Sequence, residues 1–244
     1  LSGLGRSLRE LPVHPRLAKL LIEGKARGCA RMASELAAIL SEPSGKLPGG
    51  RLEIENDLFV RWQEWKRTPQ HPKHRLLTRA ARQLYELLDG SADVDASREV
   101  EDQMPVLLLS VYSDRLCRRR RAGEPLAKMV GGRGVKIHPD SSVKASEFFL
   151  ALELSEGRDQ SETMVFQAVG VPEDMVEREL GQKTAATKRL DWDEEKNRFF
   201  VIETREWGGL SMGKEHRRPA SSDEIEGRLA EVAFNRFDRL RAEN

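Results

Sequence analysis

The chain has 244 residues, of which 39% are hydrophobic and 33% are charged, and its formal net charge is +1. This length allows one large domain or two to three small ones, and no apolar run approaches the roughly 20 residues that a membrane span needs. The two cysteines, Cys29 and Cys117, form no CxxC pattern, so they indicate reduced thiols in a cytoplasmic protein rather than a zinc site or a disulfide framework.

Charge is unevenly distributed along the chain. Residues 1–121 hold 22 Lys and Arg against 16 Asp and Glu, a net of +6, whereas the remainder holds 19 against 24, a net of −5. A basic first half favours an anionic partner, although helical surfaces are often charged for solubility alone.

The first half predicts a unit of five or six helices. Leucines at near-helical spacing begin the chain until Pro12 and Pro15 interrupt them. Apolar residues then recur at helical spacing in four segments, 15–24, 28–41, 54–66 and 76–88. A last helix is predicted over 104–121, ending in Arg118–Arg121, where the helix dipole favours cations.

After Gly123 the periodicity changes to that of strands. "PLAKMVGGRGVKIHP" predicts a hairpin, "SEFFLALELSEG" and "SETMVFQAVG" predict two strands, and "VPEDMVEREL" predicts a short helix. Two or three strands follow over 188–219, and Ser222 is expected to cap a final helix. The predicted fold class is therefore α+β with several domains: a helical bundle, a small β unit and a β-rich extension ending in a helix.

No catalytic pattern is present in the sequence. It has no GxxxxGK[ST] phosphate loop, no HExxH and no nucleophile elbow, and His71 and His74 in a Pro-rich loop make a poor metal site. "GGRG" at 131–134 could bring backbone amides close to a phosphate, but it is more typical of a hairpin turn. We expect no catalytic residue, no metal site and no cofactor site in this chain.

The remaining chemistry is that of binding. A helical unit with an arginine run, followed by a basic hairpin, suits a phosphate backbone, and such binding would depend on salt. Phe148 and Phe149 should point to opposite faces of a strand, with one in the core and the other stacking on bases, unless both are structural.

Several segments resemble DEAH/RHA-family helicases. "LSGLGRSLRELPVHPRLAKLLI" resembles their "LTxLGRxLxxLPVxPRLAxML" segment, which joins a winged-helix domain to a helical ratchet (HA2) domain. "DLFVRWQEW" is similar to the Asp-initiated ratchet helix, and "LLLSVYSDRLCRRR" is similar to "LALAYPDRIAxRR" of the bacterial HrpB type, although "SVYSDR" departs from the usual "AYPDR". "GRGVKIHPDSSV" and "PEDMVEREL" resemble the strand, turn and closing helix of the family's oligonucleotide-binding (OB) fold, and "RLDWDEEKNRFFVIETREWGGL" resembles the HrpB-type C-terminal extension.

This resemblance implies a domain order. It comprises the end of a winged-helix domain (1–14), a ratchet domain (15–122), an OB-fold (123–182) and an HrpB-type extension (183–244). The chain would be the C-terminal half of an ATP-dependent RNA helicase, without the two RecA-like domains that carry the Walker A and DEAH motifs. The parent would be an NTP hydrolase that uses ATP and Mg²⁺, whereas this chain alone would be inactive.

The resemblance also implies how the chain would act. Ratchet helices would close one side of a single-strand channel and the OB-fold would hold RNA near its entrance, while the absent domains step the strand past these contacts. The expected strand contacts are Arg133, Lys136, His138, Ser141 and Ser142, and after them Arg118, Arg119, Arg120 and Arg121. The alternative for the first five residues is an ordinary hairpin with a capped turn. The alternative for the four arginines is a solvated helix end.

The expected partners are single-stranded RNA, or DNA in its place, and the parent's own RecA-like and winged-helix domains, with no membrane. A second hypothesis is a platform for a protein that regulates the helicase, which the acidic second half would suit. Salt-dependent RNA binding by the chain would separate the two hypotheses.

Overall fold

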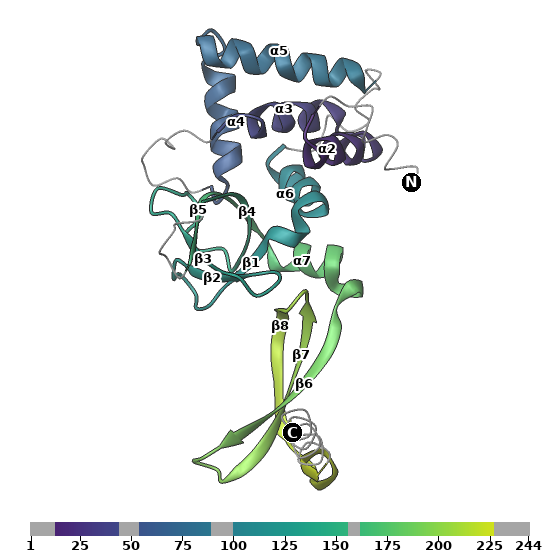
Figure 1. The fold of residues 1–244 in the computed structure, drawn as a ribbon, viewed down its shortest axis with the longest axis vertical. Helices are drawn as coiled ribbons and strands as arrows, with labels where there is room; N and C mark the ends of the chain where they lie inside the picture. The colour runs from purple at the N-terminus through teal and green to yellow at the C-terminus, as the bar shows by residue number, and fades with distance from the viewer. Residues whose placement is uncertain (1–12, 44–53, 89–99, 156–161, 227–244) are drawn as a thin grey trace, which may run out of the picture. The chain divides into compact units, whose positions relative to one another are not determined.

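The computed structural model describes residues 13–43, 54–88, 100–155 and 162–226, and the fold is α+β. Helices, a closed five-stranded barrel and a three-stranded sheet follow one another along the chain (Figure 1). The chain divides into two compact units, residues 1–179 with 208–210 and residues 180–207 with 211–244. The expected end of a winged-helix domain lies almost wholly outside the described residues.

Helices α2 (Pro15–Ala26) and α3 (Ala30–Leu40) pack closely because small residues meet between them. A Cβ added at Gly24 would lie 2.2 Å from the Cβ of Ala33, so only glycine fits there. Gly24 was expected to end the first helix, but the helix continues to Ala26, and the glycine with a left-handed backbone after it is Gly28, at φ 72°. The small-residue face predicted from the sequence is therefore the packing face.

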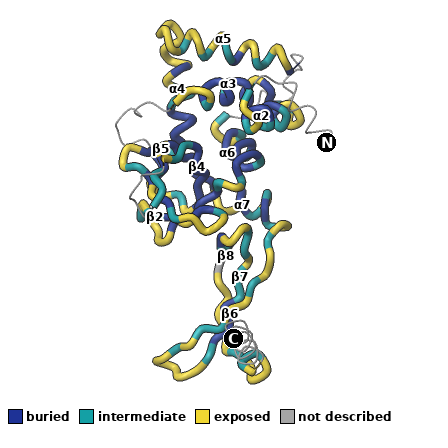
Figure 2. The backbone as a smooth tube through the Cα atoms, viewed as in Figure 1, coloured by how far each residue is buried: buried dark blue, intermediate teal, exposed yellow. Residues whose placement is uncertain are grey.

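Helix α4 (Asp57–Arg67) runs between the barrel and α5 (Pro72–Leu87), as Figure 1 shows. Asn56 caps α4, its Oδ1 accepting a hydrogen bond from the Phe59 amide at 2.9 Å. Helix α5 packs on α3 but is mostly exposed (Figure 2), and Leu76 is 64% exposed. It starts four residues before the predicted helix because Pro72 suits the first helical turn.

Two of the segments that carry the family resemblance meet in space. Helix α6 (Val100–Tyr112) is followed by a short 3-10 turn, η1 (Ser113–Arg115). The guanidinium of Arg16, from "PRLA", donates to both carboxylate oxygens of Asp114, from "SDR", at 2.7 and 2.9 Å. These hydrogen bonds hold the pKa of Asp114 below its usual value and join α2 to the start of the barrel.

The barrel has the strand order β1-β2-β3-β5-β4. Its strands are β1 (Leu116–Arg119), β2 (Leu126–Met129), β3 (Gly134–Ile137), β4 (Phe148–Ser155) and β5 (Thr163–Val171). Neighbouring strands are antiparallel except β3 and β5, which run parallel. The interior is apolar and is formed by Cys117, Ala127, Met129, Val135, Ile137, Val143, Phe149, Ala151, Val165 and Ala168.

The prediction of one helix over 104–121 is wrong. Helix α6 ends at Tyr112, and residues 116–119 form strand β1, which pairs with both β2 and β4. The arginine run therefore does not lie at a helix C-terminus. Of the two interpretations of Phe148 and Phe149, the structural one is confirmed and the stacking platform is wrong, since both rings are buried, 1% and 0% exposed.

The predicted hairpin and short helix are present. The β2–β3 turn places Gly131 and Gly132 at φ 82° and 89°, a region that favours glycine. Helix α7 (Glu173–Leu180) follows β5. Among the described residues, no helix is both long enough and apolar enough to cross a membrane.

The sheet β6 (Ala185–Asp193), β7 (Arg198–Trp207) and β8 (Leu210–Pro219) belongs to the second unit except for Leu210. The guanidinium of Arg217 lies 4.2 Å from the centre of the Phe200 ring. Residues 222–226 are helical, and the rest of the predicted final helix lies outside the described residues. The cap is Ser221, one residue before the predicted Ser222, because Ser221 and Glu224 bond reciprocally as a capping box.

Candidate nucleic-acid interface

The outer face of the barrel over β3 and β5 carries an aromatic pair. Side chains alternate along β3, so Val135 and Ile137 point into the core while Lys136 and then His138 lie outside. Phe166 on the neighbouring β5 is 38% exposed. The rings of His138 and Phe166 stack with centres 5.0 Å apart and planes 30° apart. The barrel thus carries a partly exposed pair of stacked rings on the same face as a lysine.

Hydrogen bonding fixes the orientation of the His138 ring. The amide of Asp140 donates to His138 Nδ1 at 3.2 Å. In the neutral ring the proton is therefore on Nε2, because Nδ1 serves as the acceptor. The imidazole is therefore held in place, and its Nε2–H is the donor left for another group.

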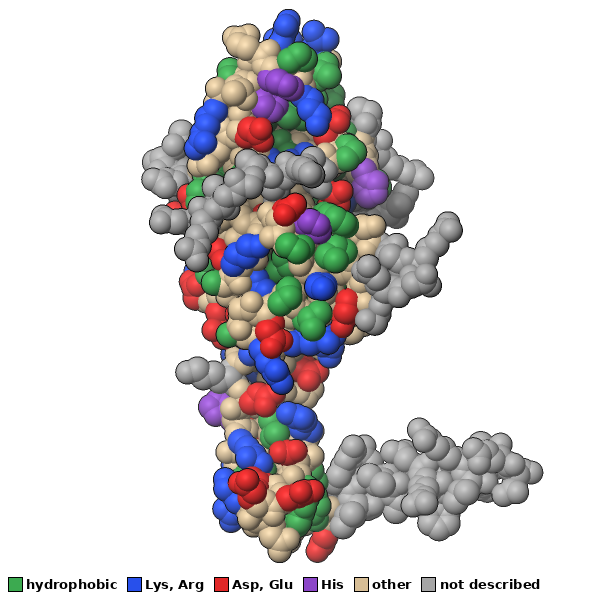
Figure 3. All heavy atoms as spheres, turned by 90° about the vertical axis from the view of Figure 1, so that its left-hand side faces the viewer, with side chains coloured by type: hydrophobic (Ala, Val, Ile, Leu, Met, Phe, Trp, Pro, Cys, Tyr) green, Lys and Arg blue, Asp and Glu red, His purple; other side chains and the backbone are tan. Residues whose placement is uncertain are grey.

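Two exposed lysines lie on the same outer face as the aromatic pair, toward the start of β3. Lys136 lies on β3, and Lys128 lies on the adjacent β2, where it pairs with Gly134 across the strands. Neither lysine has an acidic partner in the described part of the chain. Arg133 is exposed in the turn between these strands. Figure 3 looks onto the side where β3 and β5 lie in Figure 1, and hydrophobic and histidine side chains lie there among both basic and acidic ones.

The four arginines of the run have different environments. Arg118, Arg120 and Arg121 each pair with a carboxylate, those of Glu147, Glu162 and Glu124 respectively. Arg119 is only 6% exposed and donates to three backbone carbonyls, those of Val143, Ser146 and Glu124. Arg119 is thus a structural residue that ties together the end of the barrel.

Ser141 and Ser142 also lie inside the molecule. They are 1% and 7% exposed, and both hydroxyls donate to the carboxylate of Asp57 at 2.7 Å. Asp57, fully buried at the first turn of α4, accepts two more hydrogen bonds, from the amides of Ser142 and Ala168 at 2.6 and 2.8 Å. These serines therefore fasten the helix to the barrel, and we leave them out of the candidate interface.

A second carboxylate strengthens the same joint. Glu55 accepts hydrogen bonds from three successive amides, those of Lys144, Ala145 and Ser146. Burial by itself would raise the pKa of Glu55, but these bonds outweigh it and hold that pKa below its ordinary value. Segment 55–57 thus supplies two anions to amide and hydroxyl donors of the barrel loop.

Stability should therefore depend on pH through Glu55. Because its pKa is lower in the folded state, its contribution is complete above the ordinary value of 4.5 and is lost as pH falls through the lower, folded value. We expect Glu55→Gln to lower the free energy of unfolding at pH 7 and to flatten its decline below pH 4.5. Urea unfolding at a series of pH values measures this. An unchanged decline would contradict the assignment.

Sequence reasoning missed Phe166, Lys128 and the role of Asp57. Strict alternation in "TMVFQ" could have placed Phe166 opposite the buried Val165, and alternation in "LAKM" could have placed Lys128 outside. No local signal pairs Asp57 with Ser141, because 84 residues separate them.

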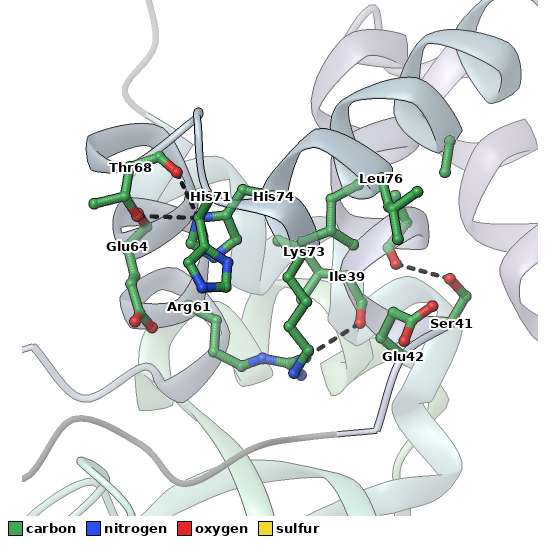
Figure 4. Close-up of a pocket in the computed structure, with 13 residues that line it drawn as sticks. Ile39, Ser41, Glu42, Arg61, Glu64, Thr68, His71, Lys73, His74 and Leu76 are labelled. Carbon is green, nitrogen blue, oxygen red and sulfur yellow. Dashed lines mark hydrogen bonds between the residues drawn. The ribbon is translucent and has the colours of Figure 1, made fainter.

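A groove of about 620 Å³ lies elsewhere in the same unit, between α3, α4 and α5. Figure 4 shows His71 and His74 side by side at one end, with Arg61 below them. His74 Nδ1 contacts the carbonyl of Thr68 at 2.8 Å, and Arg61 donates to the carbonyl of Ile39. In the described ranges no group of three or more His, Cys, Asp or Glu could hold a metal ion.

Two solved structures share the fold of this chain. The chain shares its fold with part of an *Escherichia coli* protein whose crystal structures are described as those of a DExH-box NTPase and of a DEAH/RHA helicase. The TM-scores are 0.65 and 0.63 at 21% and 22% identity, over 92% of this chain. No family model matches the chain.

That protein is HrpB. The chain is 24% identical over 226 residues, 92% of its length, to the ATP-dependent RNA helicase HrpB of *Escherichia coli* (strain K12). It spans about a quarter of the length of this relative, which is 25% by sequence and 25–26% in the two structures. The resemblance to HrpB-type helicases found in the sequence motifs is therefore confirmed along nearly the whole chain.

Proposed function

We propose that this chain is an accessory module of an HrpB-type RNA helicase and that its barrel holds single-stranded RNA. The observation that carries the proposal is the stacked His138–Phe166 pair on the outer face of the barrel, beside Lys136 and Lys128. Aromatic rings stack on bases of any sequence, and lysines neutralise the phosphates between them. The similarity to HrpB over 92% of the chain supports the helicase context.

The proposed domains follow the family's order, with one changed boundary. Helices α2–α6 would be the ratchet (HA2) domain, the barrel an OB-fold, and β6–β8 the HrpB-type extension. Because β1 pairs with β2 and β4, we place the start of the OB-fold at Leu116 instead of residue 123. A five-stranded barrel that binds oligonucleotides on an outer face is typical of OB-folds.

In this proposal the chain positions RNA and does no chemistry. ATP and Mg²⁺ would be bound by RecA-like domains of the parent protein, since the present sequence contains no GxxxxGK[ST] loop. The barrel would supply a fixed set of contacts against which those domains move the strand. The acidic second half is the one feature that suits the alternative role as a platform for a regulatory protein, and the aromatic and basic face of the barrel favours RNA over it.

Binding of a fluorescein-labelled single-stranded RNA to the 244-residue chain, followed by anisotropy between 50 and 300 mM salt, tests the proposal. We expect log K to fall linearly with log salt, with a slope of about −0.7 for each phosphate contacted. Lys136→Ala should make the slope shallower by about 0.7, and Lys25→Ala on α2 is the matched control. Absence of binding at the lowest salt would contradict the proposal.

A further inference from the structure

A small hollow lies on the outer face of the barrel where β3 begins. At Gly134 the missing side chain leaves space, since a Cβ there would lie 1.8 Å from Glu162 Oε2 and 3.0 Å from Arg120 Nη2. The carboxylate of Glu162 fills this space, and its Oε1 accepts a hydrogen bond from Arg120 at 2.5 Å. The glycine that ends "GGRG" therefore makes room for a carboxylate and an arginine on the surface of the sheet.

The carboxylate of Glu162 is only half satisfied in this position. Its side chain is 18% exposed, and Oε2 is buried with no hydrogen-bond partner among the described residues. A buried charged oxygen without a partner loses its hydration and gains nothing in return. The pair therefore uses one hydrogen bond of the Arg120 guanidinium, which can hold an anion with two.

The surroundings of the hollow are basic. Lys128 stands directly across from Gly134 in the β2–β3 pairing, and Lys136 follows two residues later on the same outer face of β3. Both are the lysines of the proposed interface. Glu162 thus places a negative charge, and removes the free charge of Arg120, where a nucleic-acid strand would need positive charge.

We propose that the hollow over Gly134 is a phosphate site and that Glu162 occupies it as an internal competitor. A phosphate of the bound strand displaces the carboxylate from Arg120, and the guanidinium can then hold two phosphate oxygens at once. This inference rests on the proposed function, because the strand at Lys128 and Lys136 supplies the phosphate. Glu162 would keep affinity low until a strand engages the aromatic pair.

The variant Glu162→Gln tests this directly, because it keeps the shape of the side chain and removes its charge. We expect single-stranded RNA to bind about tenfold more tightly at low salt, the scale of one charge-assisted hydrogen bond. The plot of log K against log salt should steepen by about 0.7, because one more phosphate is neutralised. A merely structural pair would leave this slope unchanged.

Glu124→Gln is the matched control. It makes the same change in net charge and frees Arg121, whose contact with Glu124 is 3.5 Å long and exposed. We expect it to change affinity by less than about twofold, since exposed pairs of this kind contribute little. In the double variant Glu162→Gln/Arg120→Ala, the gain from Glu162→Gln should disappear.

The outcomes separate the two proposals. If the wild-type chain binds RNA and Glu162→Gln binds no more tightly than Glu124→Gln, the phosphate site is wrong and the proposed function stands. If neither the wild type nor Glu162→Gln binds RNA, the proposed function is wrong. The phosphate site is then tested by the binding of inorganic phosphate. A shift of the Gly134 amide resonance on adding phosphate to Glu162→Gln, absent when Arg120→Ala is added, would support the site, and no shift would overturn it.

Discussion

Replacing Asp57 by alanine should lower the free energy of unfolding by about 4 kcal/mol or more, because four donors lose their acceptor and each buried donor left without a partner costs about 1 kcal/mol or more. Three of the donors lie on the loop before β4 and the fourth, the Ala168 amide, lies on β5, whereas the carboxylate lies on α4. The loss of stability therefore falls on the joint between the helix and the barrel. Urea unfolding of the chain, followed by circular dichroism, measures the change.

Two further variants make this prediction specific. Asp57→Asn keeps the shape but leaves one acceptor where there were two, so about half of the loss, roughly 2 kcal/mol, should remain. Asp174→Ala removes an aspartate that is 78% exposed on α7, and its effect should be within about 0.5 kcal/mol. A loss at Asp57 no greater than at Asp174 would show that the four hydrogen bonds do not stabilise the joint.

The order of helices and strands was largely predictable because apolar periodicity is a local property. It located α2, α3 and α4, the β2–β3 hairpin and α7. It did not locate the change from helix to strand after Tyr112, since "SDRLCRRR" continues the helical pattern in the chain. Strand β1 exists because its backbone pairs with β2 and β4, and the second partner begins some thirty residues later in the chain. Such pairing leaves no trace in the local periodicity.

The candidate interface was predictable only where strand alternation alone decides exposure. Alternation in "GVKI" places Lys136 outside the barrel, and Lys136 is exposed in the structure. Ser141 and Ser142 look like the polar residues of an exposed turn, and their burial depends on a carboxylate that arrives from α4. In the same way, Arg119 looks like its neighbours in the run, yet its guanidinium is taken up by carbonyls of other loops. In both cases, partners that are distant in the sequence determine whether the side chain is buried.

Replacing Phe166 by alanine should weaken the binding of single-stranded RNA about 5- to 150-fold, the range that corresponds to one stacked base. Phe166 is the exposed member of the aromatic pair, and removing its ring also removes the stacking partner of His138. The salt dependence should stay nearly unchanged, because no phosphate contact is lost. Anisotropy titrations at two salt concentrations measure both quantities.

Phe166→Leu distinguishes stacking from simple apolar contact, because leucine keeps a comparable apolar surface without a ring face. If bases stack on the ring, leucine should behave like alanine; if the side chain only covers apolar surface, leucine should restore most of the affinity. Trp192→Ala removes another exposed aromatic residue, 45% exposed on β6 in the second unit, and should leave binding unchanged. A loss of RNA affinity in Trp192→Ala as large as that in Phe166→Ala would show that the interface is not confined to the barrel. It would also contradict the phosphate site over Gly134, which depends on a strand bound to the barrel.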